Sequence, residues 1–132
     1  MNLFQWGLFT LNSGAKSAWK IECDALSIDD WAALAEMVRQ MVGPFSTVEG
    51  VPTGGLLLAQ ALKPYTSKLP DMPHLIVDDV LTTGGSMERL KTVSGGQFRN
   101  IMGAVIFARG PCPHWIKPLF QMPQCFWLEK PK

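Results

Sequence analysis

HLIVDDVLTTGGS, residues 74–86, is the most informative stretch of this 132-residue chain. Its apolar, β-branched first half is typical of a buried strand, and it ends in two adjacent carboxylates, Asp78 and Asp79. Small and hydroxyl residues follow, and they let a backbone approach a ligand closely. A helix that begins near Gly85 would aim its free N–H groups and positive dipole end at the same point. The stretch therefore predicts a phosphate site beside two carboxylates that suit sugar hydroxyls or a metal ion. A tight turn capped by its hydroxyl groups is the alternative interpretation.

The composition of the chain indicates one globular domain over residues 1–132, since this length suffices for a single hydrophobic core. Hydrophobic residues make up 47% and the net charge is +1, which argues against nucleic-acid binding through bulk charge. No apolar run approaches the ~20 residues that cross a membrane, and the N-terminus lacks the pattern of a secretory signal. Cys23, Cys112 and Cys125 show no C-x-x-C spacing, so we expect free thiols in a reducing compartment, the cytoplasm.

The rest of the sequence predicts strands that alternate with helices. Ser27 is a good helix N-cap, and an apolar stripe at helical spacing runs from Ile28 to Val42, where Gly43 and Pro44 end the helix. The order of elements predicts an α/β fold, a mainly parallel, Rossmann-like sheet flanked by helices, with an N-terminal β-hairpin. The predicted elements are a hairpin from 8–11 and 17–22, helices 28–42, 56–62 and 85–93, strands 45–49, 74–81 and 101–108, and an edge strand within 117–122.

A second glycine-rich loop, EGVPTGG at residues 49–55, lies between a predicted strand and a predicted helix. Its exposed backbone N–H groups suit a diphosphate, although the same residues also suit any tight turn between a strand and a helix. Ligands of parallel α/β sheets bind at the carboxyl ends of the strands. Because both glycine loops follow strands, we expect them to face one crevice.

The stretch 74–86 resembles the motif that binds 5-phosphoribosyl 1-diphosphate (PRPP) in the type I phosphoribosyltransferases. That motif has an apolar run, two acids, two apolar residues and a short Thr/Gly/Ser loop. The resemblance implies that Asp78 and Asp79 contact the ribose 2- and 3-hydroxyls, that the following loop holds the 5-phosphate, and that residues 49–55 form the pyrophosphate loop. The implied PRPP-binding residues are Asp78, Asp79, Leu81, Thr82, Thr83, Gly84, Gly85, Ser86, Glu49, Gly50, Val51, Pro52 and Thr53.

A finer resemblance is to the orotate phosphoribosyltransferases, whose N-terminal F-x-L-x-S-G-x-x-S segment looks like FTLNSGAKS, residues 9–17. It implies that Lys16 approaches the diphosphate and the base and acts in catalysis with the two acids. It also implies that Arg109 pairs with the base through its planar fork, with Trp19 nearby. Solvated surface charge is the alternative for Lys16 and Arg109. The implied reaction joins an orotate-like pyrimidine to PRPP with Mg²⁺, and releases pyrophosphate.

Two features depart from the family pattern. The family carries a long mobile loop, rich in basic residues, that stabilises the departing pyrophosphate and excludes water. The corresponding segment here, residues 63–73, is short, and its only basic residues are Lys63 and Lys68. Glu49 stands where a basic residue is common, and its carboxylate would repel a diphosphate unless a metal lay between them. Two other interpretations therefore stay open, a PRPP- or nucleotide-binding regulator without turnover and a subunit whose basic loop comes from a partner chain.

Tryptophans near both ends of the chain suggest a buried patch between subunits. The candidates are Trp6, Trp19, Trp115 and Trp127, and Phe126 lies beside the last of these. Because relatives with the resembled fold usually dimerise, we expect a homodimer.

Overall fold

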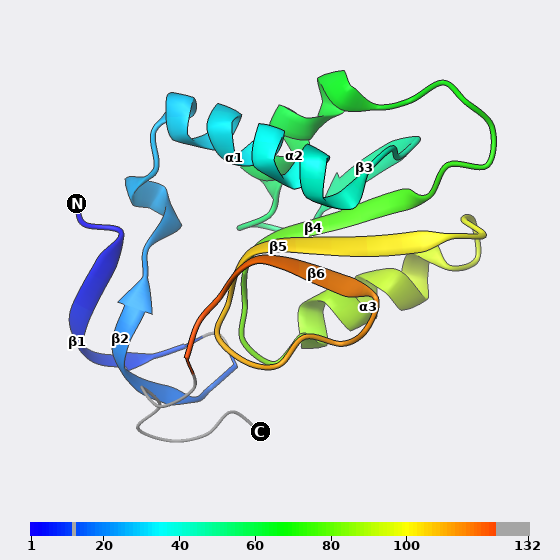
Figure 1. Cartoon of the computed structure of the whole chain (residues 1–132). Coiled ribbons are helices and arrows are strands. Elements are labelled where there is room, and N and C mark those ends of the chain that lie inside the picture. The colour runs from blue at the N-terminus through cyan, green and yellow to red at the C-terminus, as the bar shows by residue number, and fades with distance from the viewer. Residues whose placement is uncertain (12, 124–132) are drawn as a thin grey trace.

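The computed structural model describes residues 1–11 and 13–123, and its main layer is a four-stranded parallel sheet (Figure 1). The strands are β3 (Thr47–Gly50), β4 (His74–Leu81), β5 (Ile101–Ala108) and β6 (Ile116–Gln121), paired in that order. A separate antiparallel hairpin, β1 (Phe4–Thr10) and β2 (Lys16–Ile21), stands beyond the carboxyl ends of the sheet strands. The predicted α/β fold with a parallel sheet and an N-terminal hairpin is therefore confirmed.

The helices cover the two faces of this sheet, as Figure 1 shows. One face carries α1 (Ile28–Val42) and α2 (Leu56–Leu62), and the other carries α3 (Gly85–Ser94). Two short 3₁₀ turns, η1 (Cys23–Ala25) and η2 (Lys63–Tyr65), follow β2 and α2. Edge strand β6 contains Pro118, and an edge position tolerates the missing N–H donor.

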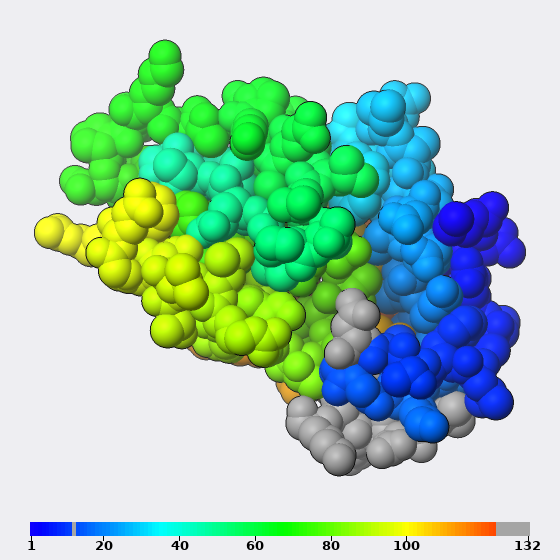
Figure 2. Space-filling model, turned by 180° about the vertical axis from the view of Figure 1, so that it is seen from behind, coloured from blue at the N-terminus to red at the C-terminus, as the bar shows by residue number. Residues whose placement is uncertain are grey.

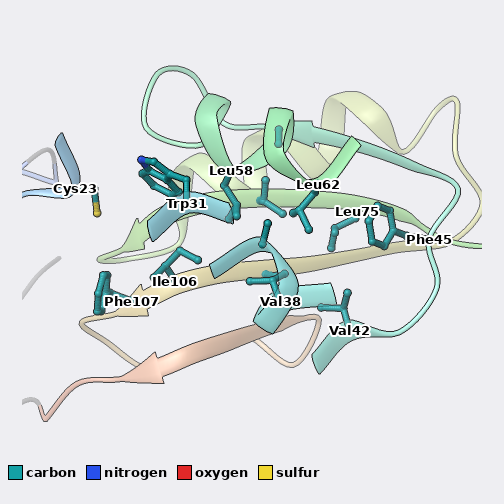
Figure 3. Close-up of a cluster of buried hydrophobic side chains, with 14 residues drawn as sticks. Cys23, Trp31, Val38, Val42, Phe45, Leu58, Leu62, Leu75, Ile106 and Phe107 are labelled. Carbon is teal, nitrogen blue, oxygen red and sulfur yellow. The ribbon is translucent and has the colours of Figure 1, made fainter. Parts of the chain in front are cut away.

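The apolar run of β4 is buried on both faces because successive side chains of a strand point to opposite sides. Leu75 and Val77 join the larger core cluster under α1 and α2, which Figure 3 shows with Trp31 and Leu58. Ile76 joins the second cluster, on the side of α3. Both faces are therefore filled up to the point where the two aspartates begin.

Helix α1 begins with the predicted cap. Asp30 donates its N–H to Ser27 Oγ at 3.1 Å, and the Asp30 carboxylate accepts from Ser27 N–H at 2.9 Å. The prediction that Ile28 belongs to the buried stripe is wrong, since this side chain is 88% exposed. The first turn of α1 extends past the sheet that buries the later residues of the stripe.

The structure tests some of the predictions on cysteines, membrane spans, domain organisation and location. Cys23 and Cys112 are free thiols, as expected, whereas Cys125, Phe126 and Trp127 lie outside the described residues. Within residues 1–11 and 13–123, no helix is long and apolar enough to cross a membrane. The single-domain organisation and the cytoplasmic location stay predictions.

Candidate functional site

A crevice of about 970 Å³ opens between the hairpin, η1 and the carboxyl ends of the sheet strands. Figure 2 shows the hairpin, in dark blue, standing out beside the green and yellow-green helices that flank the sheet. Both predicted loops and the acid pair meet in this crevice. The predicted site residues that line it are Val51, Pro52, Thr53, Asp78, Asp79, Leu81, Thr82, Thr83, Gly84, Gly85, Ser86 and Arg109.

The two acids sit at the end of β4, where the strand leaves the core. Asp78 is 9% exposed, and its Oδ1 accepts the backbone N–H of Asp79 at 2.8 Å. Asp79 Oδ1 accepts the N–H of Val80 at 2.7 Å. Burial, reinforced by the neighbouring Asp79 carboxyl, raises the pKa of Asp78 to about 8. The ligand-free pair therefore keeps a proton at neutral pH.

This raised pKa predicts a stability that falls as the pH rises. Unfolded Asp78 loses its proton near the ordinary pKa of 3.8, whereas the folded protein holds the proton up to about pH 8. Between these values the folded state binds more protons than the unfolded state, so each rise in pH favours unfolding. We expect Asp78→Asn to remove this pH dependence. At pH 8, its free energy of unfolding, measured with denaturant, should be at least ~1 kcal/mol higher than that of the wild type.

The matched control for this prediction is Asp24→Asn, because Asp24 is an exposed carboxylate of η1. The control should change the free energy of unfolding little between pH 4 and pH 8. A wild type whose stability is flat over this range, or an Asp78→Asn variant that is less stable than wild type at pH 8, would contradict the raised pKa.

The first glycine loop packs directly against the acid pair. A Cβ at Gly54 would lie 2.5 Å from Asp79 Oδ1, so only glycine lets the loop and the carboxylate approach this closely. Within the same loop, the peptide bond between Pro52 and Thr53 is cis. The loop of β3 and the acids of β4 thus form one continuous wall of the crevice.

The second loop turns from β4 into α3 through Gly84, which has a φ of 86° in the left-handed region. Buried Met87 anchors the first turn of α3 in the core, so the N-terminus of the helix is held at the crevice. Arg89 lies three residues after Ser86 in α3, donates from Nη2 to Ser86 Oγ at 3.2 Å, and also lines the crevice. The sequence analysis missed Arg89, although its spacing from Ser86 places the two on one helix face.

Arg109 follows β5 and is one of the most buried side chains, at 2% exposed. Its guanidinium lies over the Trp19 ring at 3.9 Å and donates to Ser17 Oγ at 2.6 Å. Burial lowers the pKa of Arg109 to about 10, so the group stays protonated at neutral pH. A solvated surface role for Arg109 is therefore wrong. Trp19 does not line the crevice and instead supports Arg109 from behind.

The structure does not bring Lys16 to the acid pair. Lys16 is exposed at the start of β2 and is not among the residues that line the crevice, whereas Lys20 is. Lys20 is engaged locally, with Nζ 3.0 Å from Glu22 Oε2 and 5.0 Å from the centroid of the Phe9 ring. Since residues 16 and 20 share one face of β2, their alternation alone did not show which lysine reaches the site.

Glu49 also lies away from the crevice. Its Oε1 contacts His74 Nε2 at 2.6 Å and accepts a hydrogen bond from Ser94 Oγ at the end of α3. The carboxylate therefore ties β3 to β4 and α3, and it does not face the loop that would hold a diphosphate. Gly50 is likewise outside the lining. The ideal Cβ position at Gly50 is 2.2 Å from the carbonyl oxygen of Gly55, so Gly50 packs closely against the backbone of the same loop.

The charges around the crevice nearly balance. Among the described residues, four carboxyl groups face it, those of Glu22, Asp24, Asp78 and Asp79, and the last two share one proton at neutral pH. Three cationic side chains of the same described ranges face it, those of Lys20, Arg89 and Arg109. No group of three or more His, Cys, Asp or Glu side chains in this part of the chain is arranged to hold a metal ion.

The parallel sheet, the hairpin over its carboxyl edge and the unit of strand, acids, loop and helix form the fold of the type I phosphoribosyltransferases. Among the proteins with this fold, the chain is similar to the orotate phosphoribosyltransferases. The resemblance inferred from the sequence is thereby confirmed.

Three solved structures illustrate the likeness. Orotate phosphoribosyltransferase from Aeropyrum pernix is 28% identical, with 82% of this chain and 76% of that chain covered and a TM-score of 0.69. The Mycobacterium tuberculosis H37Rv enzyme in complex with PRPP is 17% identical, with 86% of each chain covered and a TM-score of 0.65. Leishmania donovani UMP synthase is 15% identical, with 91% of this chain and 33% of that chain covered and a TM-score of 0.70. No protein-family model matches the chain, and the comparison with curated proteins finds no match.

Proposed function

We propose that this chain is a Mg²⁺-dependent phosphoribosyltransferase that joins a nucleobase, an orotate-like pyrimidine, to PRPP and releases pyrophosphate. The observation that carries the proposal is the meeting of the acid pair, both glycine loops and Arg109 in one crevice. The similar enzyme from M. tuberculosis binds PRPP, which supports PRPP as a ligand of the same fold.

The acid pair and the two loops would hold PRPP. The carboxylates of Asp78 and Asp79 accept hydrogen bonds from the ribose 2- and 3-hydroxyls, and the loop from Leu81 to Ser86 surrounds the 5-phosphate at the N-terminus of α3. In the loop from Val51 to Gly54, Pro52 has no N–H and Val51 donates its N–H to the Val77 carbonyl oxygen at 2.9 Å. The backbone N–H groups of Thr53 and Gly54 would therefore hold the diphosphate. Mg²⁺ bound to the diphosphate oxygens would supply the charge that the nearly balanced crevice lacks.

Arg109 would hold the base opposite the ribose. Its buried guanidinium is fixed by Trp19 and Ser17, so its fork is oriented before a base arrives. The base nitrogen then forms a bond to ribose C1 while the bond from C1 to the diphosphate oxygen breaks, through an oxocarbenium-like transition state, and the proton lost from that nitrogen passes to the released pyrophosphate. The rate enhancement comes from orienting the two substrates and neutralising the leaving group.

The second candidate function is a PRPP- or nucleotide-binding regulator without turnover. Residues 63–73, which stand in place of the basic loop of the family, do not line the crevice. The leaving pyrophosphate would therefore meet few cations from this chain. A partner chain that supplies the basic loop is the third reading, and co-purification followed by size-exclusion chromatography tests it.

Calorimetric titration of PRPP with Mg²⁺, followed by orotate and other bases in the same cell, tests the proposal directly. We expect PRPP to bind and one base to produce pyrophosphate, measured in parallel by a coupled assay. Binding without pyrophosphate release for any base would favour the regulator. Absence of PRPP binding would contradict both candidates.

The expected homodimer also belongs to this proposal. Trp6 and Leu8 of β1 are 79% and 88% exposed, unusually high values for large apolar side chains of one strand. Trp19 is buried against Arg109, and Trp115 donates to Glu88, so Trp6 is the best interface candidate among the described tryptophans.

We expect the wild type to sediment as a dimer and the double substitution Trp6→Ser, Leu8→Ser to sediment as a monomer, because the apolar surface that drives association is removed. Val93→Ser is the matched control, since Val93 is an exposed apolar side chain of α3, at 78%. A monomeric wild type, or a dimeric double variant, would contradict the role of β1.

A further inference from the structure

We propose that Arg89 is a phosphate-binding residue of the crevice, in addition to the loop residues that the sequence motif identifies. This inference rests on the proposed function, because it assigns Arg89 to the 5-phosphate of the sugar ligand. Arg89 lies in α3, outside the motif of residues 74–86.

The side chain of Arg89 folds back over the first turn of its own helix. Nη2 donates to Ser86 Oγ at 3.2 Å, and Nη1 lies 3.4 Å from the ideal Cβ position at Gly85. The guanidinium thus borders the crevice where the free N–H groups of α3 begin. A Cβ at residue 85 would be in ordinary van der Waals contact with the guanidinium, so the side chain of Arg89 lies directly beside the loop.

This position is electrostatically unfavourable without an anion. The N-terminus of a helix carries a partial positive charge, so a cation there is repelled while an anion is attracted. Within residues 1–11 and 13–123, no carboxylate forms an ion pair with Arg89. The adjacent Glu88 instead accepts a hydrogen bond from Trp115 Nε1 at 2.6 Å. A phosphate bound at the loop would compensate both the guanidinium and the helix dipole.

The chemistry of a guanidinium suits this ligand. Its planar fork donates two parallel hydrogen bonds to the oxygens of a phosphate, and its full charge adds to the neutral N–H groups of the loop. Most donors of Arg89 stay available, because Ser86 Oγ is the one acceptor that its guanidinium meets among the described residues. We therefore expect Arg89 to favour a phosphomonoester dianion over the same sugar without phosphate.

The same helix offers a matched control. Lys91 lies two residues further along α3, carries the same charge, and does not line the crevice. Its Nζ lies over the Trp115 ring at 4.7 Å. Lys91→Gln therefore changes the net charge as Arg89→Gln does, without removing a group from the crevice.

The test is calorimetric titration of ribose 5-phosphate, and of ribose, into the wild-type chain, Arg89→Gln, Arg89→Lys and Lys91→Gln. We expect Arg89→Gln to weaken ribose 5-phosphate binding by at least ~10-fold, the scale of one hydrogen bond to a charged group. Arg89→Lys should recover part of the loss, and Lys91→Gln should bind as the wild type does. Ribose binding should be too weak to respond to any of the substitutions.

The possible failures are distinguishable. If the wild type binds ribose 5-phosphate and Arg89→Gln binds it equally well, the role of Arg89 is wrong and the proposed function stands. An equal loss in Lys91→Gln would mean that bulk charge is responsible, which overturns the inference. If the wild type binds neither ribose 5-phosphate nor PRPP, the proposed function and the inference fail together. In the absence of ligand, Arg89→Gln should be at least as stable as the wild type, since Arg89 is exposed and its charge lies at the positive end of the helix dipole.

Discussion

Replacing both Asp78 and Asp79 by asparagine is expected to abolish measurable binding of PRPP in the presence of Mg²⁺. Hydrogen bonds to a charged group contribute about 1.5–3 kcal/mol each, so losing two of them lowers the affinity by ~10²- to 10⁴-fold. Asparagine keeps the size of each side chain but loses the charge and replaces one acceptor oxygen with a donor. The measurement is calorimetric titration of PRPP at a fixed Mg²⁺ concentration.

The buried charge of the acid pair makes this result separable from misfolding. Because Asp78 is buried beside a second carboxyl, removing both charges should stabilise the fold above neutral pH. The double variant should therefore unfold at a higher denaturant concentration than the wild type at pH 8 while it fails to bind. Asp24→Asn, in the same crevice, should bind PRPP within a few-fold of wild type. Undiminished affinity in the double variant would refute the assigned ribose site.

The central strand and its loops were predictable because their signals are local. The continuous apolar run of β4 requires burial on both faces, and the structure places Ile76 and Val77 in different core clusters. The cap and turn residues in the sequence predicted both ends of α1 and the start of α3, and the structure has these helix ends at the predicted positions. The meeting of both glycine loops followed from the rule that parallel strands present their carboxyl ends at one edge.

The residues that were misplaced depend on contacts between distant segments. Ser17 and Arg109 are 92 positions apart, and their hydrogen bond helps to fix how the hairpin meets the sheet. That contact helps to determine which lysine of β2 reaches the crevice, and periodicity along one strand carries no information about it. Glu49 turns to His74 and Ser94 for the same reason, since both partners are more than 20 positions away.

Arg89 is a different case, because its signal was present in the sequence. Residues three apart on a helix are neighbours, so a helix that begins at Gly85 places Arg89 above Ser86. A motif defined by its loop ends before such a residue. Candidate cationic residues for phosphate binding should therefore be looked for in the first turn of the helix as well as in the loop.

Replacing Arg109 by methionine is expected to lower the affinity for the base by ~10²-fold, because the fork that would orient it is lost while a flexible side chain fills the same space. PRPP affinity should fall only a few-fold, because the acid pair and both glycine loops are unchanged. The affinity for the base is measured by titrating orotate in the presence of pyrophosphate and Mg²⁺, so that no reaction follows. The affinity for PRPP is measured by titrating PRPP without a base. An equal loss for both ligands would contradict the role of Arg109.

A structural contribution of Arg109 has to be separated from this effect on the base. The contact with Trp19 and the hydrogen bond to Ser17 should make Arg109→Met less stable by about 1–3 kcal/mol, since both partners stay buried. Ser17→Ala is the matched control, because it removes the hydrogen bond and leaves the guanidinium in the crevice. If Arg109 holds the base, Ser17→Ala should lose part of the stability but little of the base affinity. If the arginine only braces the hairpin, stability and base affinity should fall in proportion in both variants.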